Sequence, residues 1–76
     1  MKLSELKINT YAIILSVELK NPKVKRRLLE MGFTPGTMIK VTKIAPLGDP
    51  IGVFLRGYEV CISRFEASYI CIRVEK

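Results

Sequence analysis

The sequence predicts a mostly β fold, a small five-stranded barrel with one helix inserted between the first and second strands. Three observations support this class. Apolar residues alternate with period two in several short runs, as they do in half-buried strands. One stretch, residues 22–31, has helical spacing instead. The chain has only 76 residues, which suits a single small domain, and closing the sheet protects its edges.

The first strand is predicted at residues 11–19, after a short lead-in turn at residues 2–8 that places leucines on the core. The run alternates cleanly, so we expect one well-buried face. Its other face begins with Ala12 and Ile14, which indicates that the first half of the strand is central or partly covered. The residues expected on the buried face are Tyr11, Ile13, Leu15, Val17 and Leu19.

The helix is predicted at residues 22–31. Asn21 is a good N-cap, and Pro22 fits the first helical position, where a missing N–H costs nothing. Gly32 stands where a helix favours a left-handed C-terminal residue. The apolar stripe of this helix consists of Val24, Leu28 and Met31, and its outer side is basic.

Four further strands are predicted at residues 37–45, 51–55, 58–62 and 70–74. Pro35-Gly36 favours a type II turn before the second strand, and Arg56-Gly57 favours a tight hairpin turn between the third and fourth. Residues 46–50 form a stiff loop with a proline at each end. Ser63 followed by Glu66 has the form of a capping box, which predicts one helical turn.

Composition argues against an enzyme. There is no His, the acidic residues are dispersed, and the five glycines form no phosphate-binding loop. Cys61 and Cys71 are read as small apolar strand residues, so no metal site and no cofactor is expected. The longest apolar run, residues 11–15, is too short to span a membrane, and Glu5 and Lys7 argue against a signal peptide. We expect a location in the cytoplasm, or at the periphery of the inner membrane through a partner.

The positive charge is concentrated on one element. The chain has 13 Lys and Arg against 7 Asp and Glu, a net charge of +6. Such a cluster can steer association with an acidic protein face, a nucleic acid or an anionic membrane. The alternative is a solvated helix face that keeps the protein soluble. The clustered residues are Lys20, Lys23, Lys25, Arg26 and Arg27.

A long motif resembles one known family. Residues 26–37 follow the pattern R-x-L-x-E-M-G-F-x-P-G-T, residues 45–50 read A-P-L-G-D-P, and Arg56-Gly57-Tyr58 and Glu66-Ala67 follow. Over about residues 3–74 the chain resembles the FeoA family of small cytosolic proteins encoded beside the ferrous-iron transporter FeoB, and the C-terminal module of diphtheria-toxin-repressor-type regulators. The resemblance implies an SH3-like barrel and a role in ferrous iron uptake through contact with the cytosolic part of FeoB.

The candidate partner surface combines the basic helix with two loops. The 46–50 loop exposes an apolar residue on a stiff scaffold, as recognition loops do, although it could equally be a hairpin connection kept rigid for stability. We expect the helix charges to raise the association rate and the loop to provide a second contact. The predicted partner-binding residues are Lys23, Arg26, Arg27, Leu47, Gly48, Asp49 and Arg56.

Two other functions are alternatives to binding a transporter. A small basic barrel binding nucleic acid is the main alternative, but its aromatic residues are dispersed along the sequence and the basic helix contains none, so no nucleic acid is expected. Direct iron binding is disfavoured by the missing His and the two separated Cys, although weak binding of a transition metal ion is left open. A weak homo-oligomer is also left open.

Overall fold

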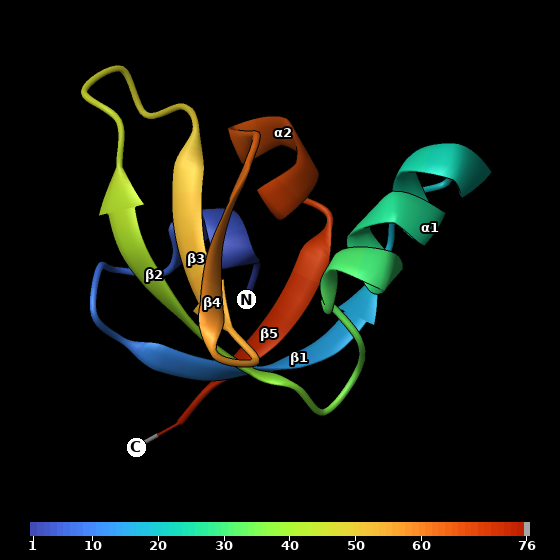
Figure 1. The fold of residues 1–76 in the computed structure, drawn as a ribbon, viewed down its shortest axis with the longest axis horizontal. Helices are drawn as coiled ribbons and strands as arrows, with labels where there is room; N and C mark the ends of the chain where they lie inside the picture. Colours follow the sequence, from blue (N-terminus) through green and yellow to red (C-terminus); the bar gives the residue numbers. More distant parts are fainter. Residues whose placement is uncertain (76) are drawn as a thin grey trace.

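The computed structural model describes residues 1–75 and contains one five-stranded antiparallel sheet that curls around a single core (Figure 1). The strand order is β4-β3-β2-β1-β5. One helix, α1, is inserted between the first two strands, so the predicted fold class is confirmed. The elements are η1 (Leu3–Glu5), β1 (Tyr11–Val17), α1 (Pro22–Met31), β2 (Met38–Ile44), β3 (Ile51–Leu55), β4 (Tyr58–Ile62), α2 (Arg64–Ala67) and β5 (Ile70–Val74).

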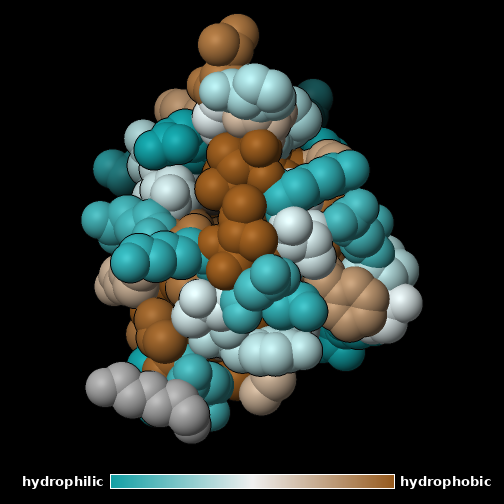
Figure 2. All heavy atoms as spheres, turned by 90° about the vertical axis from the view of Figure 1, so that its left-hand side faces the viewer, coloured by the Kyte–Doolittle hydropathy of each residue, from teal (hydrophilic) through white to brown (hydrophobic). Residues whose placement is uncertain are grey.

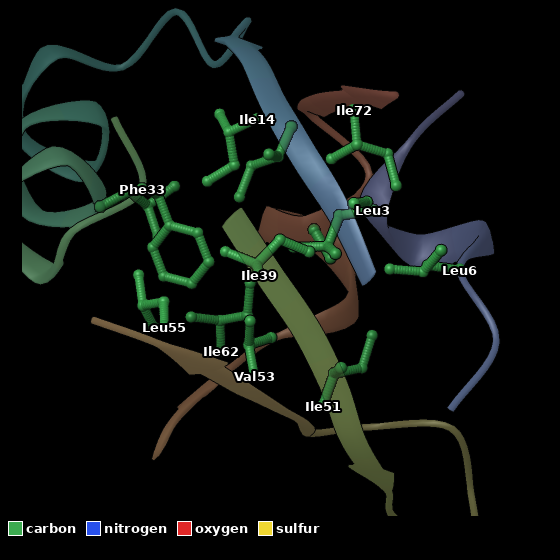
Figure 3. Packing of buried hydrophobic residues seen from close by; sticks show 14 of the residues in the cluster. Leu3, Leu6, Ile14, Phe33, Ile39, Ile51, Val53, Leu55, Ile62 and Ile72 are labelled. Carbon is green, nitrogen blue, oxygen red and sulfur yellow. The ribbon is translucent and has the colours of Figure 1, made fainter. Parts of the chain in front are cut away.

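The core is formed by the inward faces of all five strands together with η1 and the segment after α1. Phe33 is fully buried and points into the sheet between Ile39 and Leu55 (Figure 3). Leu3 and Leu6 close the opposite end, as predicted for the lead-in turn. Because Phe33 directly follows the end of α1, its burial fixes the helix to the barrel.

The predicted buried face of β1 is wrong over its first half. Ala12 and Ile14 point into the core, whereas Tyr11 and Leu15 are 47% and 49% exposed. The pairing of β1 with β5 shifts register between Ile14 and Ser16, and this bulge returns Val17 to the core side. The strand also ends at Val17, two residues earlier than predicted, although Leu19 is buried.

Helix α1 has the predicted bounds and caps. The Asn21 Oδ1 atom accepts hydrogen bonds from the backbone N–H groups of Lys23 and Val24, and Gly32 ends the helix at φ 114°. Of the predicted apolar stripe, however, only Leu28 is fully buried, while Val24 and Met31 are half-buried. The helix therefore lies against the side of the barrel (Figure 1), and most of its residues are exposed.

The turns follow the predicted chemistry. The Arg56-Gly57 turn has positive φ angles of 49° and 88°, the geometry of a two-residue hairpin, and Gly36 has a φ of 89°. Strand β2 is one residue shorter at each end than predicted. Asn9, at φ 67°, provides the turn before β1, and its N–H donates to the Val41 carbonyl at 2.8 Å.

The two ends of the sheet differ. Along β5, the Ile72 N–H donates to the Met1 carbonyl at 2.8 Å, and Lys2 forms an isolated bridge with Cys71, so the first residues cover this edge. At the other end of the sheet lies β4, which pairs with β3 in an uninterrupted register. Within residues 1–75, no helix has the length and apolarity to cross a membrane.

Candidate functional site

The basic face of α1 is exposed, but its charges are not equivalent. Lys23 and Arg26 have no carboxylate within ion-pair distance among the described residues. Arg27, in contrast, forms an ion pair with Glu66 of α2. An open cleft of about 380 Å³ lies along this side of the helix. The residues that line the cleft are Pro22, Lys23, Arg26, Arg27 and Glu30.

Arg27 is the ion-pair partner of a nearly buried carboxylate, that of Glu66. The Glu66 side chain accepts from the Ser63 N–H at 2.9 Å, and the Ser63 hydroxyl accepts from the Glu66 N–H at 3.0 Å, which is the predicted capping box. Glu66 is only 8% exposed, so its carboxylate requires a partner. Arg27 therefore has an internal role, because its ion pair with Glu66 ties α1 to α2.

The 46–50 loop presents one apolar side chain on a fixed backbone. Leu47 is 97% exposed at its tip. The Gly48 N–H donates to the Ala45 carbonyl at 2.7 Å, and Gly48 adopts a φ of 87°. Asp49 Oδ1 accepts from the backbone N–H of Arg64 at 2.9 Å, which ties the loop to α2. Gly48 and Asp49 thus shape and anchor the loop, and Leu47 is the side chain that the loop exposes to a partner.

Arg56 lies apart from this loop. The loop precedes β3 and the Arg56-Gly57 turn follows it, so the two are at opposite ends of a five-residue strand, roughly 15 Å apart. The Arg56 guanidinium donates to the hydroxyl oxygens of Thr34 and Thr37 at 2.8 and 3.0 Å. The structure brings the loop close to α2, and α2 to α1. Arg56 lies away from the loop and packs beside Gly32 at the end of α1.

The thiols lie on different strands. Cys61 is exposed on β4, and Cys71 is half-buried on β5, where the Lys2 ammonium donates to its Sγ atom at 3.1 Å. This contact raises the pKa of Lys2. At the far side of the sheet, a hydrogen bond from the Thr42 hydroxyl lowers the pKa of the Glu59 carboxyl. Within residues 1–75, no three Cys, Asp or Glu side chains gather into a metal-binding group.

The outward side of the sheet gathers residues that sequence reasoning had treated as dispersed. Strand register places Tyr11 of β1, Lys40 of β2 and Phe54 of β3 directly opposite one another. The Lys40 ammonium lies 5.2 Å from the centre of the Tyr11 ring. The side of the molecule beneath the 46–50 loop also shows a column of hydrophobic side chains between hydrophilic margins (Figure 2). Only the register, which depends on distant strands, could have revealed this arrangement.

Comparison with known proteins identifies the family. The family model for the FeoA domain matches residues 1–74. The chain belongs to the FeoA family. The family model spans nearly the whole chain, so the resemblance seen in the sequence motif is confirmed.

A curated relative carries a FeoA domain within a longer chain. It is the Fe(2+) transport protein A/Fe(2+) transporter FeoB fusion protein of Porphyromonas gingivalis, 40% identical over 70 residues. That match covers 92% of this chain but only 8% of the fusion protein, so this chain spans a small part of its length.

Solved FeoA structures have the same fold. The FeoA protein from Chlorobium tepidum has a TM-score of 0.93 and 42% identity, and the match covers 100% of this chain and 71% of that one. Stenotrophomonas maltophilia FeoA, described as a procaryotic SH3 domain protein complexed with zinc, has a TM-score of 0.83 and 31% identity. Here the match covers 95% of this chain and 88% of that one. The predicted SH3-like fold is therefore confirmed.

Proposed function

We propose that this FeoA-family protein acts in the cytoplasm as an accessory protein that binds the cytosolic part of a FeoB-type transporter. The observation that carries this proposal is the relative in which a FeoA domain and FeoB form one polypeptide. Two domains that are fused in one organism and separate in another commonly bind each other. Fusion favours this binding because it raises the effective concentration of one domain at the other.

The contact surface in this proposal includes α1 and the 46–50 loop. Of the predicted partner-binding residues, Lys23, Arg26 and Leu47 have no side-chain bond to another residue within 1–75. Arg27, Asp49 and Arg56 each hold another part of the fold, and Gly48 shapes the loop. We therefore expect the first three to contact the partner directly and the other four to contribute by holding the surface in place.

The test uses the immobilised cytosolic region of the FeoB encoded in the same genome and the full chain as analyte. Biolayer interferometry is expected to show saturable binding that weakens as salt rises, because the unpaired cations steer association. An unrelated G domain serves as the control surface. No binding at low salt would contradict the proposed function.

Arg26→Glu is expected to slow association with that region by about tenfold and to flatten its dependence on salt. Dissociation and stability should change little, because Arg26 is exposed and without an ion-pair partner among the described residues. Lys7→Glu, the same change of charge at an exposed residue before β1, is the matched control. Equal association rates for both variants would contradict a role for α1.

Leu47→Ala is expected to speed dissociation about threefold to tenfold without changing association, since it removes apolar contact area made only in the complex. Stability should stay unchanged because Leu47 is 97% exposed. Ile8→Ala, at a residue 45% exposed in the turn before β1, is the control. A dissociation rate for Leu47→Ala that equals the wild-type rate would show that the loop is only a rigid connection.

The chain is expected not to retain ferrous iron at one ion per molecule. Ferrous iron favours imidazole, carboxylate or thiolate ligands, and the two thiols lie on separate strands. Anaerobic titration with ferrous iron followed by desalting should leave the protein essentially free of iron in a colorimetric assay. One retained iron that disappears in Cys61→Ser or Cys71→Ser would overturn this expectation.

A further inference from the structure

The outward side of β1, β2 and β3 carries a group of largely apolar side chains, which we call the outer sheet face. Tyr11, Lys40 and Phe54 form one row across the three strands, and Ile13 and Met38 pair in the next row. Their chain neighbours Ala12, Ile39 and Leu55 are buried, so these residues point outward. Leu15, released outward at the β1 bulge, extends the same face. The outer sheet face consists of Tyr11, Ile13, Leu15, Met38, Lys40 and Phe54.

The apolar exposure of this face is unusual for a surface that faces only water. Tyr11, Leu15, Met38 and Phe54 are between 40% and 49% exposed. Single exposed apolar residues are ordinary, but neighbours on paired strands form one patch, and such patches mark interaction sites. The helices α1 and α2 do not cover it, because their contacts are with the edge of the barrel near β4 and with η1.

The charges around the face indicate what it binds. Lys43 pairs with Glu59 at 3.7 Å, and Arg73 pairs with Glu75 at 3.6 Å. Lys40 is half-buried in the middle of the patch and has no carboxylate within ion-pair distance in the described part of the chain. A ligand that covers this ammonium must bring it an anion, since a buried unpaired charge is costly. We therefore expect a ligand that has apolar groups around one negative charge.

The dimensions favour a helix. Three strands about 4.8 Å apart span roughly 10 Å, close to the diameter of an α-helix with short side chains. The distance from Tyr11 to Leu15 along β1 is roughly 13 Å, about two and a half helical turns. A single-stranded nucleic acid fits less well, because it needs several unpaired cations and a series of aromatic rings. This face offers one cation without an ion pair in the described part of the chain, and two separate aromatic rings, Tyr11 and Phe54, beside aliphatic side chains.

We propose that the outer sheet face binds an amphipathic helix of two to three turns that places apolar side chains on Phe54, Met38 and Leu15 and one carboxylate opposite Lys40. This inference rests on the proposed function, and the helix is sought in the cytosolic region of the FeoB partner. It adds an apolar contact to those proposed for α1 and the 46–50 loop.

The experiment maps binding on the whole chain. Isotope-labelled protein is titrated with the unlabelled cytosolic region, and amide shifts are followed by NMR. The largest changes are expected in β1, β2 and the end of β3. Lys40→Glu and Phe54→Ser should each weaken affinity at least tenfold. Phe65→Ser, at a phenylalanine that is 63% exposed on α2, should change it less than twofold.

Each outcome decides the matter. If the region binds but shifts only α1 and the 46–50 loop, and Lys40→Glu binds normally, the outer sheet face is not the site and the proposed function stands. If the region does not bind at all, the proposed function fails and this inference fails with it. If a 12-nucleotide single strand shifts the outer sheet face instead, the ligand class is wrong. Should Phe54→Ser fail to fold, Met38→Ser replaces it, and the wild-type shift map remains decisive.

Discussion

Phe33→Ala is expected to leave much of the chain unfolded at room temperature. Phe33 is fully buried between β2 and β3, directly after α1. Removing such a ring costs about 3–5 kcal/mol, the sum of lost burial and the cavity left behind. A domain of this size has a total stability near the lower end of about 5–15 kcal/mol. Loss of this one side chain therefore removes most of the free energy of unfolding.

Urea denaturation followed by circular dichroism measures the effect. Phe65→Ala is the matched control, because this ring is 63% exposed and contacts Tyr69 edge-on at 5.1 Å between ring centres. We expect the control to lose less than about 1 kcal/mol. Equal midpoints for Phe33→Ala and wild type would show that Phe33 does not fix α1 to the barrel.

Arg27→Glu is expected to destabilise the fold by about 1–3 kcal/mol. The substitution removes the ion-pair partner of Glu66 and places a second carboxylate beside it. Glu66 is 8% exposed, which raises the free-energy cost of leaving its charge unpaired. The Arg27 side chain is half exposed to solvent, and this exposure limits the strength of the ion pair. The contact joins α1 to α2, so the loss should be seen in global unfolding.

Arg26→Glu is the matched control one residue away. Its stability should stay within about 0.5 kcal/mol of wild type, because the Arg26 side chain pairs with no group among the described residues. Adding Glu66→Gln to Arg27→Glu should restore part of the loss, since the repulsion between carboxylates disappears. If both charge reversals leave the urea midpoint unchanged, the Arg27–Glu66 pair contributes nothing to stability. Binding studies of α1 should accordingly use Arg26 rather than Arg27.

The sequence predicts the local elements of this fold well, because their causes are local. Asn21 and Gly32 set the ends of α1 through bonds and φ angles within a few residues, and Ser63 and Glu66 cap α2 in the same way. The buried face of β1 was mispredicted because alternation alone cannot reveal a bulge. Leu15 is the extra residue there, and the β5 pairing that accommodates it lies more than fifty residues away.

The candidate site likewise combines features with local causes, which the sequence predicts, and features that depend on distant residues. The exposure of Lys23, Arg26 and Leu47 follows from the helix period and from the two prolines of the loop, both visible in the sequence. The bonds that occupy Arg27, Asp49 and Arg56 join residues 39, 15 and 22 positions apart, and no local pattern indicates them. The row of Tyr11, Lys40 and Phe54 likewise exists only once three strands have paired.

The pairing of the first strand with the last affects how the chain folds as it is synthesised. Strand β1 lies between β2 and β5, and its pairing with β5 requires residues 70–74. A ribosome-bound chain that ends before residue 70 therefore lacks one side of the barrel, and long-range pairs of this kind form late. Some proteins carry such a domain ahead of other sequence, for example when it is fused to a transporter. The following segment then supplies the length that brings residue 74 out of the ribosomal exit tunnel. The barrel can close while the rest of that protein is still being synthesised.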